Sequence, residues 1–177
     1  MSEALNRFRL DGRIVLVTGV SSGLGTHFAR LLAGAGARVA VAARCADKLH
    51  ALVDDIAAVG GEARALSLDV TDSASVRSCF DEMASWGAPD VVVNNAGITV
   101  TRPLLEQTED DFDRVIETNL KGCWLVATEA ARRMVAAGHG GSIVNLASSL
   151  GDRVAGGVVP YAISKAGVVQ TTKTMAL

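Results

Sequence analysis

The chain alternates short, continuously apolar runs with longer segments in which apolar residues recur every three or four positions. The apolar runs are expected to be strands, and they cover residues 13–17, 38–43, 63–68, 91–93 and 142–147. The periodic segments are expected to be helices, and they cover residues 26–34, 47–59, 72–85, 109–137 and a last stretch that begins at residue 160. Apolar strands separated by helices indicate a parallel sheet covered on both faces. We therefore expect an α/β protein with a doubly wound sheet in three αβα layers.

Composition and charge narrow the class further. The chain has 177 residues, 49% of them hydrophobic, which suits one compact domain over residues 1–177 and is too apolar for disorder. The net charge is -2, no block of like charge occurs, and no apolar run is long enough to span a bilayer. Residues 1–13 carry scattered charge without an apolar segment, unlike a secretory signal. We therefore expect a cytoplasmic protein that binds neither nucleic acid nor a membrane.

The cysteines and histidines do not form a recognisable metal or disulfide pattern. Cys45, Cys79 and Cys123 lie far apart in the sequence, and neither a C-x-x-C pair nor an H-E-x-x-H motif occurs. An odd number of scattered cysteines is typical of a reducing compartment. We expect no metal site.

A glycine-rich turn follows the first expected strand. Residues 18–25 have the spacing T-G-x-x-x-G-x-G, which is neither a P-loop nor the G-x-G-x-x-G form. Glycine permits a positive φ and lets backbone N–H groups approach a phosphate at the start of a helix. The same glycines would also serve simply to pack a helix against a strand. The place inside a βαβ unit favours dinucleotide binding. The candidate cofactor residues in this turn are Gly19, Ser21, Ser22, Gly23, Leu24 and Gly25.

The second expected strand ends without the acidic residue that often binds the ribose 2′-OH of a dinucleotide. Ala43 and Arg44 stand there instead. A guanidinium suits a 2′-phosphate, so Arg44 favours NADP(H) while NAD(H) stays possible; the alternative is a solvated loop arginine. Asp69, at the end of the third expected strand, is a candidate acceptor for the adenine amino group, and the alternative there is an ordinary helix cap.

Tyr161 and Lys165 form a pair at i,i+4 spacing, which places both side chains on one face of the last helix. Tyr161 is the only tyrosine in the chain. A neighbouring ammonium favours the phenolate, which lets a tyrosine act as a general acid or base. Ser148 follows the fifth expected strand, at the carboxyl end where such sheets bind ligands. Each feature alone has an ordinary structural explanation, but together with the glycine-rich turn they favour an oxidoreductase site.

In order and spacing, these residues resemble the short-chain dehydrogenase/reductase family, of the type called classical. The resemblance covers essentially the whole chain and rests on Thr18-Gly19-x-x-x-Gly23-x-Gly25, Asp69-Val70, Asn94-Asn95-Ala96-Gly97, Asn119, Ser148, Tyr161 and Lys165. It implies a Rossmann-like fold. It also implies the interconversion of a small-molecule carbonyl and a secondary alcohol with NADP(H) or NAD(H), with 3-oxoacyl thioesters, sugar acids and small ketones among the candidate substrates.

The resemblance further implies a role for each catalytic residue. Tyr161 exchanges a proton with the substrate oxygen, Lys165 favours the ionised phenol and binds the nicotinamide ribose, and Ser148 holds the substrate oxygen. Asn119 keeps a water chain to Lys165 in place. The expected cofactor site comprises the glycine-rich turn with Arg44, Asp69, Val70, Asn95, Ala96, Gly97, Tyr161 and Lys165. Ser22 stands where NADP-preferring members often carry a basic residue.

Members of this family usually run to about 250 residues in one domain. We therefore expect a fragment that lacks the last strands of the family fold, with its fifth strand left as a sheet edge. The resemblance implies a homo-oligomer, a dimer or tetramer, formed by the long helix and the helix that carries Tyr161. Residues 112–126 are apolar over a broad arc, as that interface requires. Two other hypotheses remain: a dinucleotide-binding module without turnover, and an interaction protein that uses the two long helices.

Overall fold

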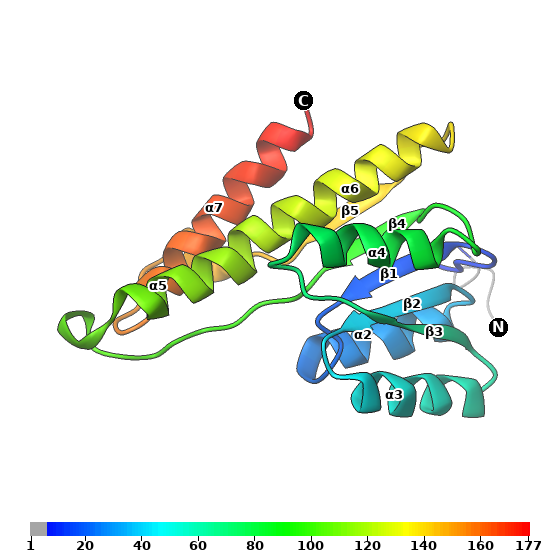
Figure 1. Ribbon diagram of the computed structural model, residues 1–177, viewed down its shortest axis with the longest axis horizontal. Coiled ribbons are helices and arrows are strands. Elements are labelled where there is room, and N and C mark those ends of the chain that lie inside the picture. The colour runs from blue at the N-terminus through cyan, green and yellow to red at the C-terminus, as the bar shows by residue number, and fades with distance from the viewer. Residues whose placement is uncertain (1–6) are drawn as a thin grey trace.

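The central sheet is parallel throughout. In the computed structural model, which describes residues 7–177, its strands are β1 (Ile14–Thr18), β2 (Arg38–Ala43), β3 (Glu62–Ser67), β4 (Val91–Asn94) and β5 (Ser142–Asn145). They lie in the order β3-β2-β1-β4-β5, so the chain runs outward from β1 to one edge and then crosses back to build the other side (Figure 1). Residue Val15 pairs with Val39 on one side and with Val91 on the other. The expected α/β, doubly wound architecture is confirmed.

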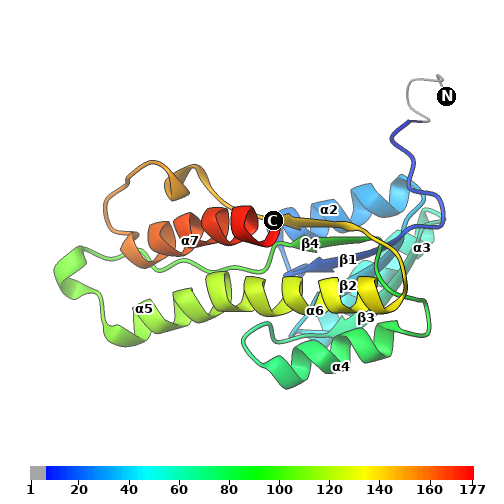
Figure 2. The ribbon, with the colours of Figure 1, turned by 90° about the horizontal axis from the view of Figure 1, so that it is seen from above.

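Helices cover both faces of this sheet. They are α2 (Gly23–Gly34), α3 (Ala46–Ala58), α4 (Ser73–Met83), α5 (Glu109–Ile116), α6 (Gly122–Ala136) and α7 (Val159–Met175), with the short turns η1 (Leu104–Glu106), η2 (Glu117–Lys121) and η3 (Ser149–Gly151). Alternate residues of β1 face opposite sides: Val15 and Val17 pack with α2 and α3, whereas Ile14 and Leu16 pack with α4 and α6. Figure 2 shows α2 and α6 on opposite sides of the sheet, and α7 packs against α5 and the η2 turn.

Several boundaries differ from the sequence-based expectation. Helix α2 begins at Gly23 rather than at residue 26, because the glycine-rich turn continues directly into the helix. Strand β5 ends at Asn145, and the chain then leaves the ladder toward the turn capped by Ser148. The expected helix over 109–137 is interrupted by η2, a π-helical turn that the apolar periodicity did not indicate.

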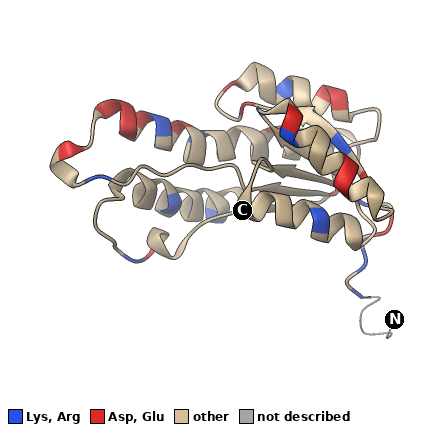
Figure 3. Cartoon of the chain, turned by 90° about the horizontal axis from the view of Figure 1, so that it is seen from below, with Lys and Arg blue, Asp and Glu red and all other residues tan. Residues whose placement is uncertain are grey.

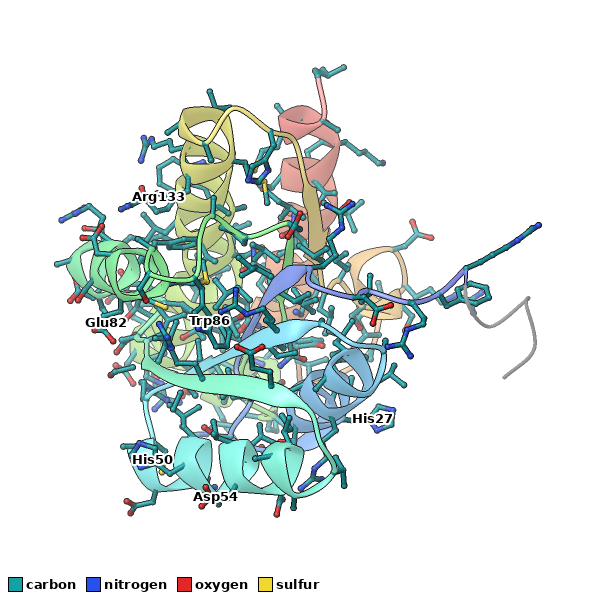
Figure 4. All side chains as sticks on the ribbon, turned by 90° about the vertical axis from the view of Figure 1, so that its right-hand side faces the viewer. His27, His50, Asp54, Glu82, Trp86 and Arg133 are labelled. Carbon is teal, nitrogen blue, oxygen red and sulfur yellow. The ribbon has the colours of Figure 1, made fainter. Side chains whose placement is uncertain are left out.

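The core is dense around β1 and thinner at β5. All five residues of β1 are buried, but β5 alternates exposed and half-buried positions, and Val144 is 48% exposed. The expectation that β5 forms an edge of the sheet is confirmed for the described residues 7–177. Trp86, labelled in Figure 4, lies beside β2 and β3. The guanidinium groups of Arg38 in β2 and Arg64 in β3 lie 4.4 and 4.6 Å from the centroid of its ring.

The surface carries both signs of charge. Figure 3 shows basic and acidic residues interspersed over the helices and loops. Acidic side chains gather at the start of α5, where Glu109, Asp110 and Asp111 complement the positive end of the helix. Within residues 7–177, no helix is both long enough and apolar enough to cross a membrane.

Candidate active site

The glycine-rich turn after β1 is shaped by backbone geometry. Gly19 has a φ of +70°, and a Cβ there would lie 2.6 Å from the Cα of Ala96. A Cβ on Gly25 would lie 2.5 Å from Nδ2 of Asn95. Gly23 has a φ of +60° and open space where a Cβ would be. Thus two of the glycines permit close packing against the loop after β4, and the third permits a left-handed turn.

That packing is reinforced by side-chain hydrogen bonds across the sheet. The hydroxyl oxygen of Thr18 accepts from the backbone N–H groups of Asn95 and Ala96, each at 3.1 Å. In return, Nδ2 of Asn95 donates to the carbonyls of Thr18 at 2.9 Å and Gly19 at 3.0 Å. The two loops that follow β1 and β4 therefore form one rigid unit at the carboxyl edge of the sheet.

A cavity of about 620 Å³ opens at this edge. Its lining includes most of the expected cofactor residues, namely Gly19, Ser21, Ser22, Leu24, Arg44, Asp69, Val70, Asn95, Ala96 and Gly97. Gly23 and Gly25 are not among the lining residues; they shape the turn from behind. The cavity thus gathers residues that follow four different strands, as expected for ligand binding at the switch point of a doubly wound sheet.

Two features make the cavity suitable for phosphate. Ser22 precedes α2 with an extended backbone and makes no side-chain cap, so the first N–H groups of this 12-residue helix are not capped by it. The first turn of α2 also lacks acidic residues. Arg44 lies exposed at the wall of the cavity and takes part in none of the ion pairs found within residues 7–177.

Asp69 is held by its own loop. Its Oδ1 accepts from the hydroxyl of Thr71 at 2.7 Å and from the backbone N–H of Thr71 at 3.0 Å. The Thr71 hydroxyl bond is the main cause that lowers the pKa of Asp69, and the charge of Arg44 adds to it. The alternative role of Asp69 as a helix cap is wrong, because Asp72 caps α4 by accepting from the N–H of Ala74 at 2.8 Å.

A second cavity of about 440 Å³ contains the tyrosine–lysine pair. Tyr161 and Lys165 both line it, and it shares Leu24, Asn95, Gly97 and Ile98 with the first cavity, so the two cavities adjoin. Thr99, Thr101, Leu150 and Val158 complete much of its wall. Tyr161 and Lys165 therefore lie next to the expected cofactor residues, whereas Ser148 and Asn119 line neither cavity.

Lys165 is fixed within this second cavity. Its Nζ donates to the carbonyl of Leu146 at 2.7 Å and lies 5.5 Å from the centroid of the Tyr161 ring. Only 5% of Lys165 is exposed, and this burial lowers the pKa of its ammonium. Leu146 directly follows β5, and its own N–H donates to the carbonyl of Asn94 at 2.9 Å.

Asn119 occupies the π turn and is bound on three sides. Its Oδ1 accepts from the N–H of Ile98 at 2.8 Å, and its Nδ2 donates to the carbonyl of Ile98 at 2.9 Å. The same Nδ2 also donates to the hydroxyl of Ser164 at 3.0 Å. A Cβ on Gly97 would lie 3.2 Å from Oδ1 of Asn119 and 3.7 Å from Nζ of Lys165, which places all three residues side by side.

Ser148 caps η3 and is not among the lining residues of either cavity. Its Oγ accepts from the N–H of Leu150 at 3.1 Å. Within residues 7–177 no hydrogen bond joins Ser148 to Tyr161, so its predicted contact with a substrate oxygen stays a prediction.

Sequence reasoning overlooked three groups that hold this site. They are the Thr18 hydroxyl, the main chain of Ile98 and the Ser164 hydroxyl. Main-chain partners leave no signal in the residue type. Thr18 belongs to the glycine-rich motif, but the motif does not indicate a role for its hydroxyl, and Ser164 lies between Tyr161 and Lys165. Asn94 also joins two strands, because its Nδ2 donates to Oδ1 of Asn145 at 2.9 Å and ties β4 to β5.

The described part of the chain contains no cluster of side chains that could bind a metal ion. Among residues 7–177, no three His, Cys, Asp or Glu side chains gather as a metal site would require. Figure 4 shows His27 on α2 and His50 on α3, well separated. Burial raises the pKa of Cys79 to about 12 and that of Cys123 to about 11, so both remain thiols at neutral pH.

Known proteins are similar to this chain in both sequence and architecture. The chain is 39% identical over 170 residues to sorbitol dehydrogenase of Cereibacter sphaeroides, covering 96% of this chain and 65% of that protein. It is 36% identical to the 3-oxoacyl-(acyl-carrier-protein) reductase of Escherichia coli strain K12, covering 94% and 67%. The chain thus spans about 65% of the length of its curated relatives.

Solved structures agree with the sequence relatives. A gluconate 5-dehydrogenase from Burkholderia cenocepacia J2315, in complex with NADP and tartrate, superimposes with a TM-score of 0.92 at 40% identity. That match covers 98% of this chain and 68% of the other. A short-chain type dehydrogenase/reductase from Mycobacterium marinum gives a TM-score of 0.93 at 42% identity, covering 98% and 70%. The family model for the short chain dehydrogenase matches residues 13–177. With its T-G-x-x-x-G-x-G turn, its Tyr161–Lys165 pair and this fold, the chain belongs to the classical short-chain dehydrogenase/reductase family.

Proposed function

We propose that the protein containing this chain is an NADP(H)-dependent oxidoreductase that interconverts a small-molecule carbonyl and a secondary alcohol. One observation carries the proposal: the cavity lined by Tyr161 and Lys165 adjoins the cavity suited to a dinucleotide and shares four wall residues with it. A nicotinamide extending from the first cavity into the second would meet the tyrosine–lysine pair. Residues 1–177 are proposed to act as a single dinucleotide-binding domain.

The residues at the edge of the sheet fit such a dinucleotide. The N-terminus of α2, with Gly19, Ser21 and Ser22 in the lining of the cavity beside it, suits a pyrophosphate. Arg44 lies free at the wall of the cavity and would pair with a 2′-phosphate, which favours NADP(H) over NAD(H). The gluconate 5-dehydrogenase of B. cenocepacia was solved with NADP, which supports the same choice.

The mechanism assigns proton transfer to the chain and hydride transfer to the nicotinamide that the dinucleotide supplies. In reduction, the Tyr161 phenol donates its proton to the carbonyl oxygen, and in oxidation the phenolate takes the proton from the alcohol. Lys165, held by the Leu146 carbonyl, lies near the phenol ring and favours its ionised form when it is charged. Ser148 holds the substrate oxygen, and Asn119 holds a water chain that leads to Lys165.

The substrate is proposed to be a polyol or sugar acid, or a 3-oxoacyl thioester. Named relatives act on sorbitol, D-threitol and galactitol, and others are 3-oxoacyl-(acyl-carrier-protein) reductases. The catalytic cavity combines two threonines, Thr99 and Thr101, with the apolar Leu150 and Val158. The hydroxyls suit a polyhydroxylated chain, and the apolar residues suit an acyl chain.

The decisive experiment measures NADPH oxidation by the protein as its gene encodes it. A panel of ketoses, keto sugar acids and 3-oxoacyl thioesters is offered, and turnover of at least one is expected. Tyr161→Phe is the matched control, because it removes only the phenolic oxygen. Lack of turnover with every substrate, together with tight NADPH binding, would instead support a binding module without turnover.

We also propose that the protein is a cytoplasmic homo-oligomer. The faces of α6 and α7 leave Trp124 48% exposed beside a groove of about 420 Å³, whose lining includes Leu120, Gly167 and Met175. An exposed apolar face of this kind suits a second copy of the chain. Light scattering should give a dimer or tetramer, and Trp124→Glu should shift it toward the monomer; a monomeric wild-type protein would contradict this proposal. The cytoplasmic assignment is tested by fractionating cells that express the protein.

A further inference from the structure

Ser164 has a special place between the two residues of the catalytic pair. It lies on α7, is fully buried at 0% exposure, and follows Tyr161 by three residues. Its hydroxyl donates to the main-chain carbonyl of Tyr161 at 2.7 Å. The same oxygen accepts from Nδ2 of Asn119 at 3.0 Å. One hydroxyl therefore connects the turn that carries the phenol with the π turn that carries Asn119.

The direction of these bonds fixes the orientation of the Asn119 amide. A serine hydroxyl has a single hydrogen, and here the Tyr161 carbonyl receives it. The oxygen can then only accept from Asn119, so Asn119 must present its NH₂ group to α7. The main chain of Ile98 requires the same orientation, because its N–H donates to Oδ1 and its carbonyl accepts from Nδ2. Both amide hydrogens and the amide oxygen of Asn119 are thus used.

The fixed amide lies close to the catalytic ammonium. A Cβ placed on Gly97 would lie 3.2 Å from Oδ1 of Asn119 and 3.7 Å from Nζ of Lys165. A turn of Asn119 would therefore change the polar surroundings of Lys165 as well as the packing of the π turn. π-helical turns interrupt an α-helix at a cost and are common at functional sites, so this one needs support from its neighbours.

We propose that Ser164 is a positioning residue, which holds Asn119 and the first turn of α7 in the geometry that places Tyr161 beside Lys165. This inference rests on the proposed function for its catalytic consequence, but the arrangement itself belongs to the chain. Ser164 touches no substrate in this account, since its hydroxyl is engaged with Tyr161 and Asn119. It acts through these two residues.

The same helix provides a matched control. Thr172, eight residues further along α7, donates its hydroxyl to the carbonyl of Val168 at 2.8 Å and accepts from Nδ2 of Asn145 at 3.0 Å. Its hydroxyl thus bridges a helix carbonyl and an asparagine amide, as Ser164 does, but it lines neither of the two cavities of the site. Removing each hydroxyl separates a positioning effect from a general loosening of α7.

The experiment compares Ser164→Ala with Thr172→Val in the protein as its gene encodes it. The first readout is tyrosinate absorbance against pH, measured without cofactor; across residues 1–177 it reports Tyr161 alone, because that stretch has one tyrosine. Where the gene encodes further tyrosines, the difference from Tyr161→Phe isolates the signal. Ser164→Ala should shift the midpoint by at least half a pH unit, because the phenol loses its fixed position beside Lys165. Thr172→Val should leave the midpoint unchanged.

The second readout is steady-state turnover. Ser164→Ala should lower kcat at least tenfold while KM and the NADPH dissociation constant stay within threefold, as expected for a misplaced acid. Thr172→Val should keep kcat within twofold. Equal midpoints for Ser164→Ala and the wild type would overturn the inference, whatever the turnover. Absence of turnover in the wild type would overturn the proposed function alone, because the absorbance titration still decides the role of Ser164.

Discussion

The two halves of the sheet are built by different physical means. Around β1 and β2, nearly every strand residue is apolar and buried, and the helices on both faces pack onto them directly. Around β4 and β5, polar side chains do much of the joining: Asn94 reaches Asn145, and Asn119 reaches Ile98 and Ser164. The first half obtains its stability from apolar area removed from water, whereas the second obtains geometry from directional bonds.

This difference separates folding from chemistry. A buried valine in β1 determines where the strand lies but does not orient a hydrogen bond. By contrast, the Leu146 carbonyl orients the ammonium of Lys165, and the Asn119 amide donates a hydrogen bond to the hydroxyl of Ser164. We therefore expect the proposed catalytic side to lose function through small displacements that cost little stability. The nucleotide side should show the reverse. The following predictions test that division.

The largest effect is expected from the phenol. Tyr161→Phe should lower kcat by about 10²–10⁴-fold, the range that general acid–base catalysis contributes. NADPH binding and the free energy of unfolding should stay near wild-type values, because the ring remains in place. Steady-state kinetics, a fluorescence titration with NADPH and urea unfolding check the three parts. A variant that retains most of its turnover would remove Tyr161 from the mechanism.

The core of β1 should respond in the opposite way. Leu16→Ala should lower the free energy of unfolding by about 3 kcal/mol, because a fully buried side chain is lost and a cavity remains. Val144→Ala, on the half-exposed β5, should cost less than about 1 kcal/mol. Urea unfolding measures both. Equal losses at the two positions would mean that burial does not distinguish the halves of the sheet.

Arg44 tests whether the nucleotide side also discriminates between cofactors. Arg44→Ala should weaken NADPH binding by about 2 kcal/mol, roughly 30-fold, since a charge-assisted hydrogen bond to the 2′-phosphate is lost. NADH binding should change less than threefold. Isothermal titration with each dinucleotide makes the comparison. A parallel loss for both cofactors would show that Arg44 contacts something other than the 2′-phosphate.

The smallest effect concerns the pH dependence of stability on the catalytic side. Burial lowers the pKa of Lys165 in the folded state, so the unfolded chain binds more protons between that value and the ordinary 10.5. Folding is therefore opposed below the folded pKa. This cost is relieved as the pH rises toward 10.5, by up to about 1.4 kcal/mol for each pH unit that separates the folded and unfolded pKa values.

The matched variant is Lys165→Met, which has no titratable group at this position. The stability of the wild type relative to Lys165→Met should rise with pH as 10.5 is approached. Urea unfolding at several pH values measures the difference. A constant or falling difference over that interval would contradict a buried ammonium.

More of the fold than of the detailed geometry of the site could be predicted from the sequence. Apolar runs located all five strands, because a buried parallel strand must be apolar on both faces. The motif spacing also indicated which residues gather at the edge of the sheet. The π turn at Asn119 was missed because apolar periodicity does not distinguish a π turn from an α-helix, and the bonds from Asn119 to the Ile98 main chain are tertiary contacts. The roles of Thr18 and Ser164 depend on partners 77 and 45 residues away.

The bond between Thr18 and Asn95 has a consequence for folding during synthesis on the ribosome. Its two residues are 77 positions apart in the sequence. One edge of β1 therefore has no strand to pair with until β4 has been synthesised. At ribosomal speeds of about 5–20 residues per second, β1 waits about 4–15 s for that partner. During this interval β1 is an apolar strand with one unpaired edge, and such an edge can pair with another chain and aggregate. A slower ribosome between residues 18 and 91 would lengthen that exposure, and a chaperone that holds apolar strands would shorten its effect.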